Sequence, residues 1–558
     1  MRLTPERVSA EYDAGISFNT GIDLYETVET NELFFIGRQW EGVKANGLPT
    51  PVFNFLKRVV LFSVANIATD NLKLRAKPMP STVPVPTKVL DAFSSIINDQ
   101  FAAIFENNRI SGLVREFCRN AAVDGDGCLY TYWDPTVETG QVSKGGIKTE
   151  VLQNTQVLFG NPNCRSVQKQ PHIIIERRRP IEEARKMAQA DGNDPDAIVA
   201  DTKESGNLTV DNLGGAKVTV LTRLWKDEKT GTVWAYECTR TAVIRKKWDL
   251  GIDMYPVNWM NWDYVQDCYH GQAMITGLIP NQIFVNKLFA MSMISLMSLA
   301  YPKVIYDKTK VAKWSAKVGA AIGVNGSVDG VAKIIDPAAI SPQISQFIDI
   351  AISYTQKFLG ASDVALGDTR PDNAAAIIAL QRAAATPMEL TRGNLVDSME
   401  QLGRIYRAFM AEYYGERYVE VDDPEGGVGK MLIRFDFSML KDIPCAIDID
   451  AGESAYWSEV ANIQTLDNLL MQNKISTSEY LRRLPNGHIS DKEALIAVTE
   501  AAERGNMLPT ENIAPMLGNY LPASGISAEP TAPLRGGSGN GALQRIINKT
   551  GEVPRQEA

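Results

Sequence analysis

The chain has 558 residues, of which 44% are hydrophobic and 22% are charged, and it carries a formal net charge of −9. This length is too great for one hydrophobic core, so we expect a globular protein of several domains or subdomains. The acidic balance excludes an ordinary DNA-binding module, which would carry a basic face, but it permits a conduit that lets DNA slide without gripping it. The six cysteines are scattered singly. This pattern is typical of free thiols in a reducing cytosol and predicts neither a zinc knuckle nor a disulfide framework.

No targeting signal is evident at the N-terminus, because it shows no apolar h-region and no small-residue cleavage site. The most apolar run, Leu288 to Pro302, falls short of the roughly 18 to 20 residues that span a bilayer. A helix buried between protein neighbours is the better interpretation. A membrane-associated pore built on residues 278–300 is the alternative.

The first half of the chain changes from helical to strand-forming patterns. Amphipathic spacing indicates helices from residue 1 to about 120. From about 127 to 262 the pattern shortens to strands with turns rich in Gly, Asn, Asp and Pro, interrupted by one helix at "IEEARKMAQADG". This half therefore predicts a mixed α+β platform.

A second helical region follows from about 271 to 300, and a small α/β insert follows it to about 342. The Asn325-Gly326 pair predicts a hairpin turn within that insert. The next helix, residues 343–359, carries an apolar stripe (Ile344, Phe347, Ile348, Ala351, Ile352 and Phe358) and an opposite polar stripe (Gln346, Asp349, Ser353 and Lys357).

A polar loop of residues 360–373 separates this helix from a long one that runs to about Tyr414. Pro387 is expected to bend the long helix. Two strands, "KMLIRFDF" and "CAIDID", are then predicted to pair, and three shorter helices follow between Ala455 and Gly505. From about 506 the composition predicts a flexible tail.

Little in the chain indicates catalysis, so we expect no enzyme, no cofactor and no metal site. None of His172, His270 and His488 has a partner at metal-ligand spacing. The "DGDG" at residues 124–127 lacks the glycine and glutamate that a calcium loop requires, and a turn from helix into strand is the better interpretation. The basic clusters 177–179 and 245–247 are expected to form salt bridges with neighbouring acids. Trp259 and Trp262 are expected to pack in a core or interface.

A metal-dependent nuclease or hydrolase is the alternative function. Its site would combine scattered carboxylates, namely Asp436, Asp448, Asp450 and Glu453, because paired carboxylates can bind magnesium. The same residues are equally consistent with a solvated strand end.

The order of segments resembles that of tailed-bacteriophage portal proteins, the head-to-tail connectors. The resemblance covers most of residues 20–505. It rests on "NELFFIGRQWEG", then "DGDGCLYTYWD", then "GLIPNQIFVNKLFAMSMISLM" leading into "YPKVIY", and on the loop "GASDVALGDTRPDN" between two helices.

The resemblance implies a predominantly helical α+β portal fold assembled into a ring, which in this family is usually a dodecamer. The implied segments are an N-terminal wing (1–270), stem helix 1 (271–300), a clip (301–342), stem helix 2 (343–359), a tunnel loop (360–373), a long kinked wing helix with strands (374–454), crown helices (455–505) and a flexible C-terminal tail (506–558).

The resemblance also implies the function and the partners. The ring would form the channel at one capsid vertex through which double-stranded DNA is packaged and ejected without regard to sequence. It would dock the terminase large subunit and then a head-completion adaptor, and it would meet the major capsid and scaffolding proteins, in the host cytoplasm during assembly and later in the virion. The residues expected to face DNA are Ser362, Asp363, Asp368, Thr369, Arg370 and Asp372 in the tunnel loop and Gln346, Asp349, Ser353 and Lys357 on the stem.

Overall fold

The chain forms two compact units in a computed structural model, Met1–Val460 and Ala461–Ala558. The structure describes residues 3–68, 72–79, 87–141, 143–201, 216–300, 303–315, 317, 321–335, 343–358, 388–422, 430–441, 443, 445–450, 456–472, 474–484 and 492–503. The predicted tunnel loop (360–373), the first part of the long helix with Pro387, and the tail from 506 lie outside these residues.

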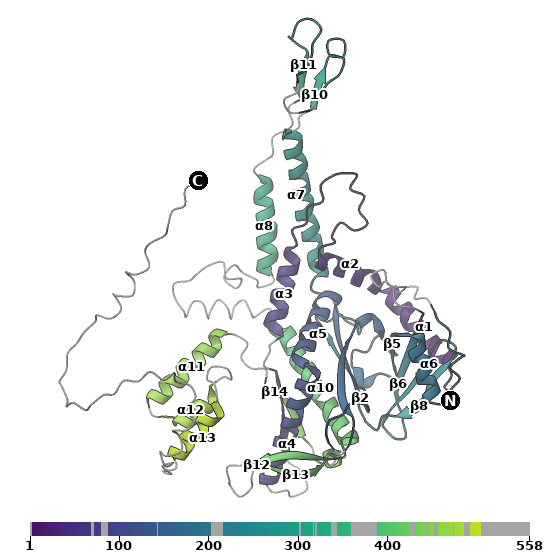
Figure 1. The fold of residues 1–558 in the computed structure, drawn as a ribbon, viewed down its shortest axis with the longest axis vertical. Helices are drawn as coiled ribbons and strands as arrows, with labels where there is room; N and C mark the ends of the chain where they lie inside the picture. The colour runs from purple at the N-terminus through teal and green to yellow at the C-terminus, as the bar shows by residue number, and fades with distance from the viewer. Residues whose placement is uncertain are drawn as a thin grey trace, which may run out of the picture. The chain divides into compact units, whose positions relative to one another are not determined.

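The N-terminal region of the first unit is helical, as the amphipathic spacing predicts (Figure 1). Its helices are α1 (Pro5–Gly21), α2 (Leu24–Ile36), α3 (Phe55–Ile67), α4 (Thr87–Asn108) and α5 (Ile110–Asp124). In α5 the apolar residues recur at helical spacing, and Val114, Phe117 and Ala121 are fully buried in the main core.

Two antiparallel sheets follow. A three-stranded sheet has the order β3-β2-β9, from β3 (Gly146–Leu152), β2 (Asp126–Asp134) and β9 (Val257–Asn261). A five-stranded sheet has the order β4-β5-β6-β7-β8, from β4 (Val157–Phe159), β5 (Ile173–Pro180), β6 (Lys217–Lys226), β7 (Val233–Cys238) and β8 (Val243–Asp249), with α6 (Ile181–Ala190) after β5. These elements match the predicted α+β platform.

The first helix covers part of the five-stranded sheet. Val8 and Tyr12 of α1 are buried with Leu158 of β4 and Ile174 of β5. The contact also has a polar component, because the Arg223 guanidinium donates to the Glu11 carboxylate at 2.6 and 3.2 Å. The Glu11 carboxylate is half-buried, and burial alone would raise its pKa, but the bonds and charge of Arg223 hold the pKa below its usual value.

Side chains occupy the free edges of several strands. Asn108 of α4 bonds Ile147 O and Thr149 N of β3, and Gln141 bonds both backbone groups of Tyr418. Asp191 accepts from Lys246 N of β8, and Asn193 donates to Ile244 O of the same strand. These edges cannot pair with another strand unless the side-chain bonds break.

One long helix packs against two different sheets of the first unit. This helix, α10 (Glu389–Tyr413), lies against β9 and β14 (Cys445–Asp450). Apolar residues recur along α10 at helical spacing, and five of them, Leu395, Met399, Leu402, Ile405 and Phe409, lie in the core at no more than 1% exposure.

The prediction that "KMLIRFDF" and "CAIDID" pair with each other is wrong. The first forms β13 (Lys430–Asp436) and pairs with β12 (Glu416–Asp422), whereas β14 pairs with β1 (Lys73–Pro78). The short turn-rich gap before β13 allows a local hairpin with β12, so β14 is left to pair with a strand far away in the sequence.

Between β9 and α10 the chain forms the helices α7 (Ile279–Ala300) and α8 (Gln343–Phe358), with a small hairpin between them in sequence. The hairpin pairs β10 (Lys303–Tyr306) with β11 (Ala332–Ile335). Asn325-Gly326 does lie in a turn region, with Gly326 at a φ of +99°. Contrary to the prediction, the turn does not connect two paired strands directly. The strand after it, β11, pairs with β10, which lies before the whole segment that contains the turn.

The second unit begins within α11 (Tyr456–Met471) and continues with α12 (Thr477–Arg483) and α13 (Lys492–Glu503). These are the three short helices expected in this region. Ser476 caps α12, because its hydroxyl accepts from Glu479 N at 3.2 Å.

Two leucines on α10 test the importance of this helix for the core. Leu402→Ala, at a position 1% exposed, is expected to destabilise the first unit by about 2–5 kcal/mol because it leaves a cavity. Leu390→Ala, on the same helix but 84% exposed, is the matched control and should cost less than about 0.5 kcal/mol. Urea unfolding followed by tryptophan fluorescence measures both. Equal midpoints for the two variants would contradict the role of α10.

Candidate assembly surface

Helices α7 and α8 pack against each other along only one side of each. Val285 and Leu288 of α7 are buried against Ile348 of α8, and half-buried Phe289 and Ile344 adjoin them. Figure 1 shows the two helices side by side. Their shared core is small compared with the apolar surface that their sequences supply.

The first half of α7 is fixed to the N-terminal helices by buried amides. Gln282 donates to Phe53 O at 2.8 Å, and Asn286 donates to the side-chain oxygen of Gln39 at 2.6 Å. Phe53 also stacks on Phe289, with 3.9 Å between ring centroids. Sequence reasoning missed this anchor. Its signal was a pair of amides four residues apart in an otherwise apolar helix, which places both on one face.

The second half of α7 leaves large apolar side chains in solvent. Leu296 is 55% and Leu299 58% exposed, and Met291, Met293 and Met297 are also exposed. Within the described residues, Thr276–Ala300 is the one helix long and apolar enough to cross a membrane. This is weak evidence for a membrane span, because a helix covered by other protein surfaces has the same length and composition. Several large apolar side chains exposed along one helix segment are typical of an interaction surface.

Helix α8 presents three different faces. Ile344, Ile348 and Ile352 lie toward α7. Phe347, Ile350 and Tyr354, which helical spacing places on a second side, are exposed. The polar residues Gln346, Asp349 and Ser353 occupy the third side. The predicted single apolar stripe is therefore two stripes, of which only one is covered within this chain.

The structure places the predicted stem residues as follows. The side chains of Gln346, Asp349 and Ser353 are exposed on one face of α8, and Lys357 belongs to the last turn of the same helix. The predicted tunnel-loop residues Ser362, Asp363, Asp368, Thr369, Arg370 and Asp372 lie outside the described residues.

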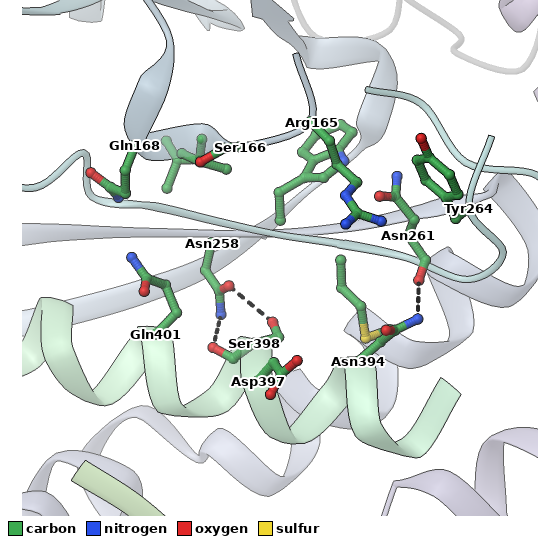
Figure 2. A pocket seen from close by; sticks show the side chains of 14 residues that line it. Arg165, Ser166, Gln168, Asn258, Asn261, Tyr264, Asn394, Asp397, Ser398 and Gln401 are labelled. Atoms are coloured by element: carbon green, nitrogen blue, oxygen red, sulfur yellow. Dashed lines mark hydrogen bonds between the residues drawn. The ribbon is translucent and has the colours of Figure 1, made fainter. Parts of the chain in front are cut away.

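A polar pocket of about 320 Å³ lies between β9, the start of α10 and the segment 165–168 (Figure 2). Asn258 and Ser398 exchange hydrogen bonds of 2.8 and 2.9 Å across it, so their polar groups are already used. Arg165 lies over the Tyr264 ring, 4.5 Å from its centroid. These contacts tie α10 to the three-stranded sheet.

The "DGDG" segment is the predicted turn. Helix α5 ends at Asp124, Gly125 has a φ of +100°, and β2 begins at Asp126. An added Cβ on Gly125 would lie 2.7 Å from Gly271 O, which explains why glycine stands there.

Asp126 is the centre of a buried hydrogen-bond cluster. Its carboxylate accepts from Asn261 and from Gly271 N, both at 2.7 Å, and bonds the His270 ring at 2.7 Å. His270 also bonds Asn19 of α1 at 3.1 Å. Asp126 is 0% and His270 3% exposed, so the cluster fastens α1 to the sheet and is sealed from any substrate. Neighbouring Asp124 has its pKa raised to about 7 by burial, against the opposing charge of Arg119.

The sequence matches a known protein family. Residues 154–452 match the family described as Phage P22-like portal protein, which is more than half of the chain. The chain belongs to this family. No curated protein matches it.

Family membership gives this portal protein a role at the capsid vertex of a tailed phage, in an oligomer associated with the capsid. The portal family is generally structural. In the part of this chain that the structure describes, no group of three or more His, Cys, Asp or Glu side chains is placed to hold a metal ion.

The carboxylates of the alternative nuclease are not brought together in the described part of the portal protein. Asp436 ends β13, whereas Asp448 and Asp450 belong to β14 in a different sheet, and Glu453 lies outside the described residues. Lys77 pairs with the Asp448 carboxylate at 2.5 Å.

The two basic clusters differ in their partners. Arg177, Arg178 and Arg179 form ion pairs with Glu150, Asp201 and Glu183, as predicted. The salt-bridge prediction is wrong for the cluster 245–247 as far as the described residues show: Arg245 lies 3.8 Å from the centroid of the Trp248 ring, and Lys247 lies over Trp234.

The two tryptophans of "VNWMNWDYV" pack in the core (Trp262) or against it (Trp259), as predicted. The Trp259 ring nitrogen donates to Tyr269 O at 3.1 Å, and its ring packs against Phe159 and Tyr269. Trp262 is 6% exposed.

Burial of Asp124 predicts a pH dependence of stability. Its folded pKa of about 7 lies above the ordinary value of 3.8, so the folded state loses stability as the pH rises from about 4 to 7. Asp124→Asn removes this loss. The free energy of unfolding of the variant should therefore exceed that of the wild type by an amount that grows from pH 5 to pH 8 and reaches roughly 2–4 kcal/mol. Thermal unfolding at both pH values measures it. The exposed Asp397→Asn is the control, and a gain that does not depend on pH would contradict the assignment.

Proposed function

We propose that this portal protein is the subunit of a closed ring that forms the DNA channel at one capsid vertex. The observation that carries this proposal is the uncovered apolar surface of α7 and α8. Exposing Leu296, Leu299 and Phe347 to water is unfavourable, and copies of the same chain supply the missing partners.

The distribution of faces on α8 supports a ring in particular. A ring uses one heterologous contact repeated around an axis, so each subunit needs two different adhesive faces. The face of Phe347, Ile350 and Tyr354 is one candidate, and the exposed half of α7 is the other. The polar face of Gln346, Asp349, Ser353 and Lys357 would then line the channel.

The channel function follows from charge. The chain carries a net −9, and every added copy increases the repulsion between the ring and DNA phosphates. Weak binding is an advantage in a channel, since strong phosphate contacts would hold DNA at fixed points. The tunnel loop 360–373 would surround the duplex, with Asp363, Asp368 and Asp372 repelling phosphate and Arg370 pairing with these acids or touching the backbone.

The remaining segments take their roles from the portal architecture. In this assignment 1–270 is the wing, 271–300 and 343–359 form the stem, 301–342 is the clip, 374–454 completes the wing and 455–505 is the crown. The clip would dock the terminase large subunit and afterwards the head-completion adaptor, and the wing and crown would meet scaffolding and major capsid proteins.

Adjacent positions on α8 test the ring. Phe347→Glu puts a charge into the proposed subunit contact and should abolish ring formation, because a buried unpaired charge is costly. Gln346→Glu adds the same charge to the polar face and should leave rings intact. Native mass spectrometry and negative-stain microscopy count the subunits, and circular dichroism checks that both variants fold. A wild-type chain that stays monomeric under assembly conditions without detergent would sink the proposal, and solubility only in detergent would favour the membrane pore.

Deletion of residues 361–371 tests the tunnel loop. The ring should still form, because the proposed contacts lie on α7 and α8, while DNA packaging or retention in particles should fall. The measurement is nuclease-protected DNA per particle, alongside ring formation by native mass spectrometry. Loss of the ring in this variant would instead make the loop part of the subunit contact.

A further inference from the structure

The hairpin region reverses the charge of the chain. Residues 301–342 contain six lysines (303, 308, 310, 313, 317 and 333) against three aspartates (307, 329 and 336), a net of +3 in a protein whose total is −9. All of its basic residues are lysines, and the segment has no arginine, glutamate or histidine.

The strand register gathers two of these lysines with two isoleucines. Lys303 lies opposite Ile335, and Ile305 lies opposite Lys333. Residues two apart on a strand, and residues directly opposite across an antiparallel pair, share a face. The four side chains therefore alternate cation and apolar group on one side of the hairpin, which we call the Lys/Ile face. All four are exposed, with Ile305 at 60% and Ile335 at 46%.

The hairpin has a folded base that supports this face. Tyr306, which points to the other side of β10, stacks on Trp314 at 5.4 Å between ring centroids. Val311 is 1% exposed, and Asp307 N donates to Val331 O at 2.9 Å. The Lys/Ile face thus belongs to a folded substructure, whose other side leaves Ile334 54% exposed.

The two lysines of the face have no acidic partner in the described part of the chain. Among the residues that the structure describes, neither Lys303 nor Lys333 forms an ion pair. Asp307, the acid nearest to Lys303 in sequence, accepts from the Thr309 hydroxyl at 2.6 Å and from Thr309 N at 2.8 Å, and these bonds lower its pKa below the ordinary value. Asp336, the acid nearest to Lys333 in sequence, lies outside the described residues.

We propose that the Lys/Ile face docks a protein partner that presents acidic side chains around an apolar contact. This inference rests on the proposed function, in which 301–342 is the clip, and it names the chemistry of the partner that the clip receives. Opposite charge steers such a partner to the hairpin and fixes its orientation, while Ile305 and Ile335 supply the buried apolar area.

Two other occupants fit less well. A DNA backbone would pair with the lysines, but phosphates leave the two isoleucines in water without compensation. The hairpin of a second copy would bring lysines against lysines, and like charges at close range are repulsive. Both remain outcomes of the test.

The experiment uses the full-length protein and three labelled probes: a peptide of alternating aspartate and leucine, a polyaspartate peptide of the same length, and a short DNA duplex. Fluorescence anisotropy measures the affinity for each probe. The variants are Lys303→Glu with Lys333→Glu, and Ile305→Ser with Ile335→Ser. The matched control is Lys44→Glu with Lys229→Glu, which makes the same charge change at exposed lysines outside the hairpin.

The Asp/Leu peptide should bind best, and the charge reversal should weaken it by about tenfold or more, since attraction becomes repulsion at two positions. The control variant should bind like the wild type. The serine variant should lose affinity for the Asp/Leu peptide but not for polyaspartate.

Three results would overturn the inference: stronger binding of the duplex than of either peptide, no binding of the Asp/Leu peptide, or an equal loss in the control variant. Loss of rings in the charge-reversal variant would assign the face to contact between copies and overturn it as well. Native mass spectrometry on the same samples separates the proposals. Absence of wild-type rings contradicts the proposed function, whereas rings that ignore the Asp/Leu peptide contradict only this inference.

Discussion

The incomplete burial of α7 and α8 is the constraint on which the rest of the molecule depends. Among the described side chains these helices share a core of three buried residues, and the second half of α7 stays in solvent. A helix gains most of its stability from packing its apolar face, not from intrinsic propensity. In the proposed ring, neighbouring copies would complete the packing of α7 and α8, so their sequence would have to satisfy the subunit and the assembly at once.

The two halves of α7 divide these tasks. The first half is fixed by the buried amides of Gln282 and Asn286, whose hydrogen bonds require one orientation of the helix about its axis. That orientation decides which side chains of the second half are left exposed. A buried polar contact with Phe53 and Gln39 thus sets the direction of an apolar surface farther along the helix, and specificity of this kind is the best-attested use of buried polar groups.

Helices, strands and their apolar faces could be predicted from the sequence, because they depend on neighbouring residues. The pairing of strands that are far apart in the sequence could not. The strands of the platform, the seam of α10 from Leu395 to Phe409 and the polar stripe of α8 follow from periodicity alone. The pairing of β14 with β1 was missed because no local signal connects residues so far apart. The Asn325-Gly326 turn was identified, but its strand partners were not, since β11 pairs with β10 across the whole segment.

The candidate assembly surface shows the same limit. Helical spacing predicted that Ile344, Phe347 and Ile348 lie within one broad apolar arc, but only the position of α7 decides that Ile348 is covered and Phe347 is not. The amide anchor is another case, because Gln282 and Asn286 look like ordinary polar residues until Phe53 and Gln39 are brought to them. The tunnel-loop residues stay a prediction from sequence.

The side chains that close the strand edges have a consequence for solubility during assembly. Asn108, Gln141, Asp191 and Asn193 each satisfy backbone groups that an approaching strand would otherwise use. A protein that exposes apolar helices at high local concentration is at risk of open-ended polymerisation through its sheets. With those edges occupied, the self-association that we propose would be directed to the helices, where growth could end by closure of a ring.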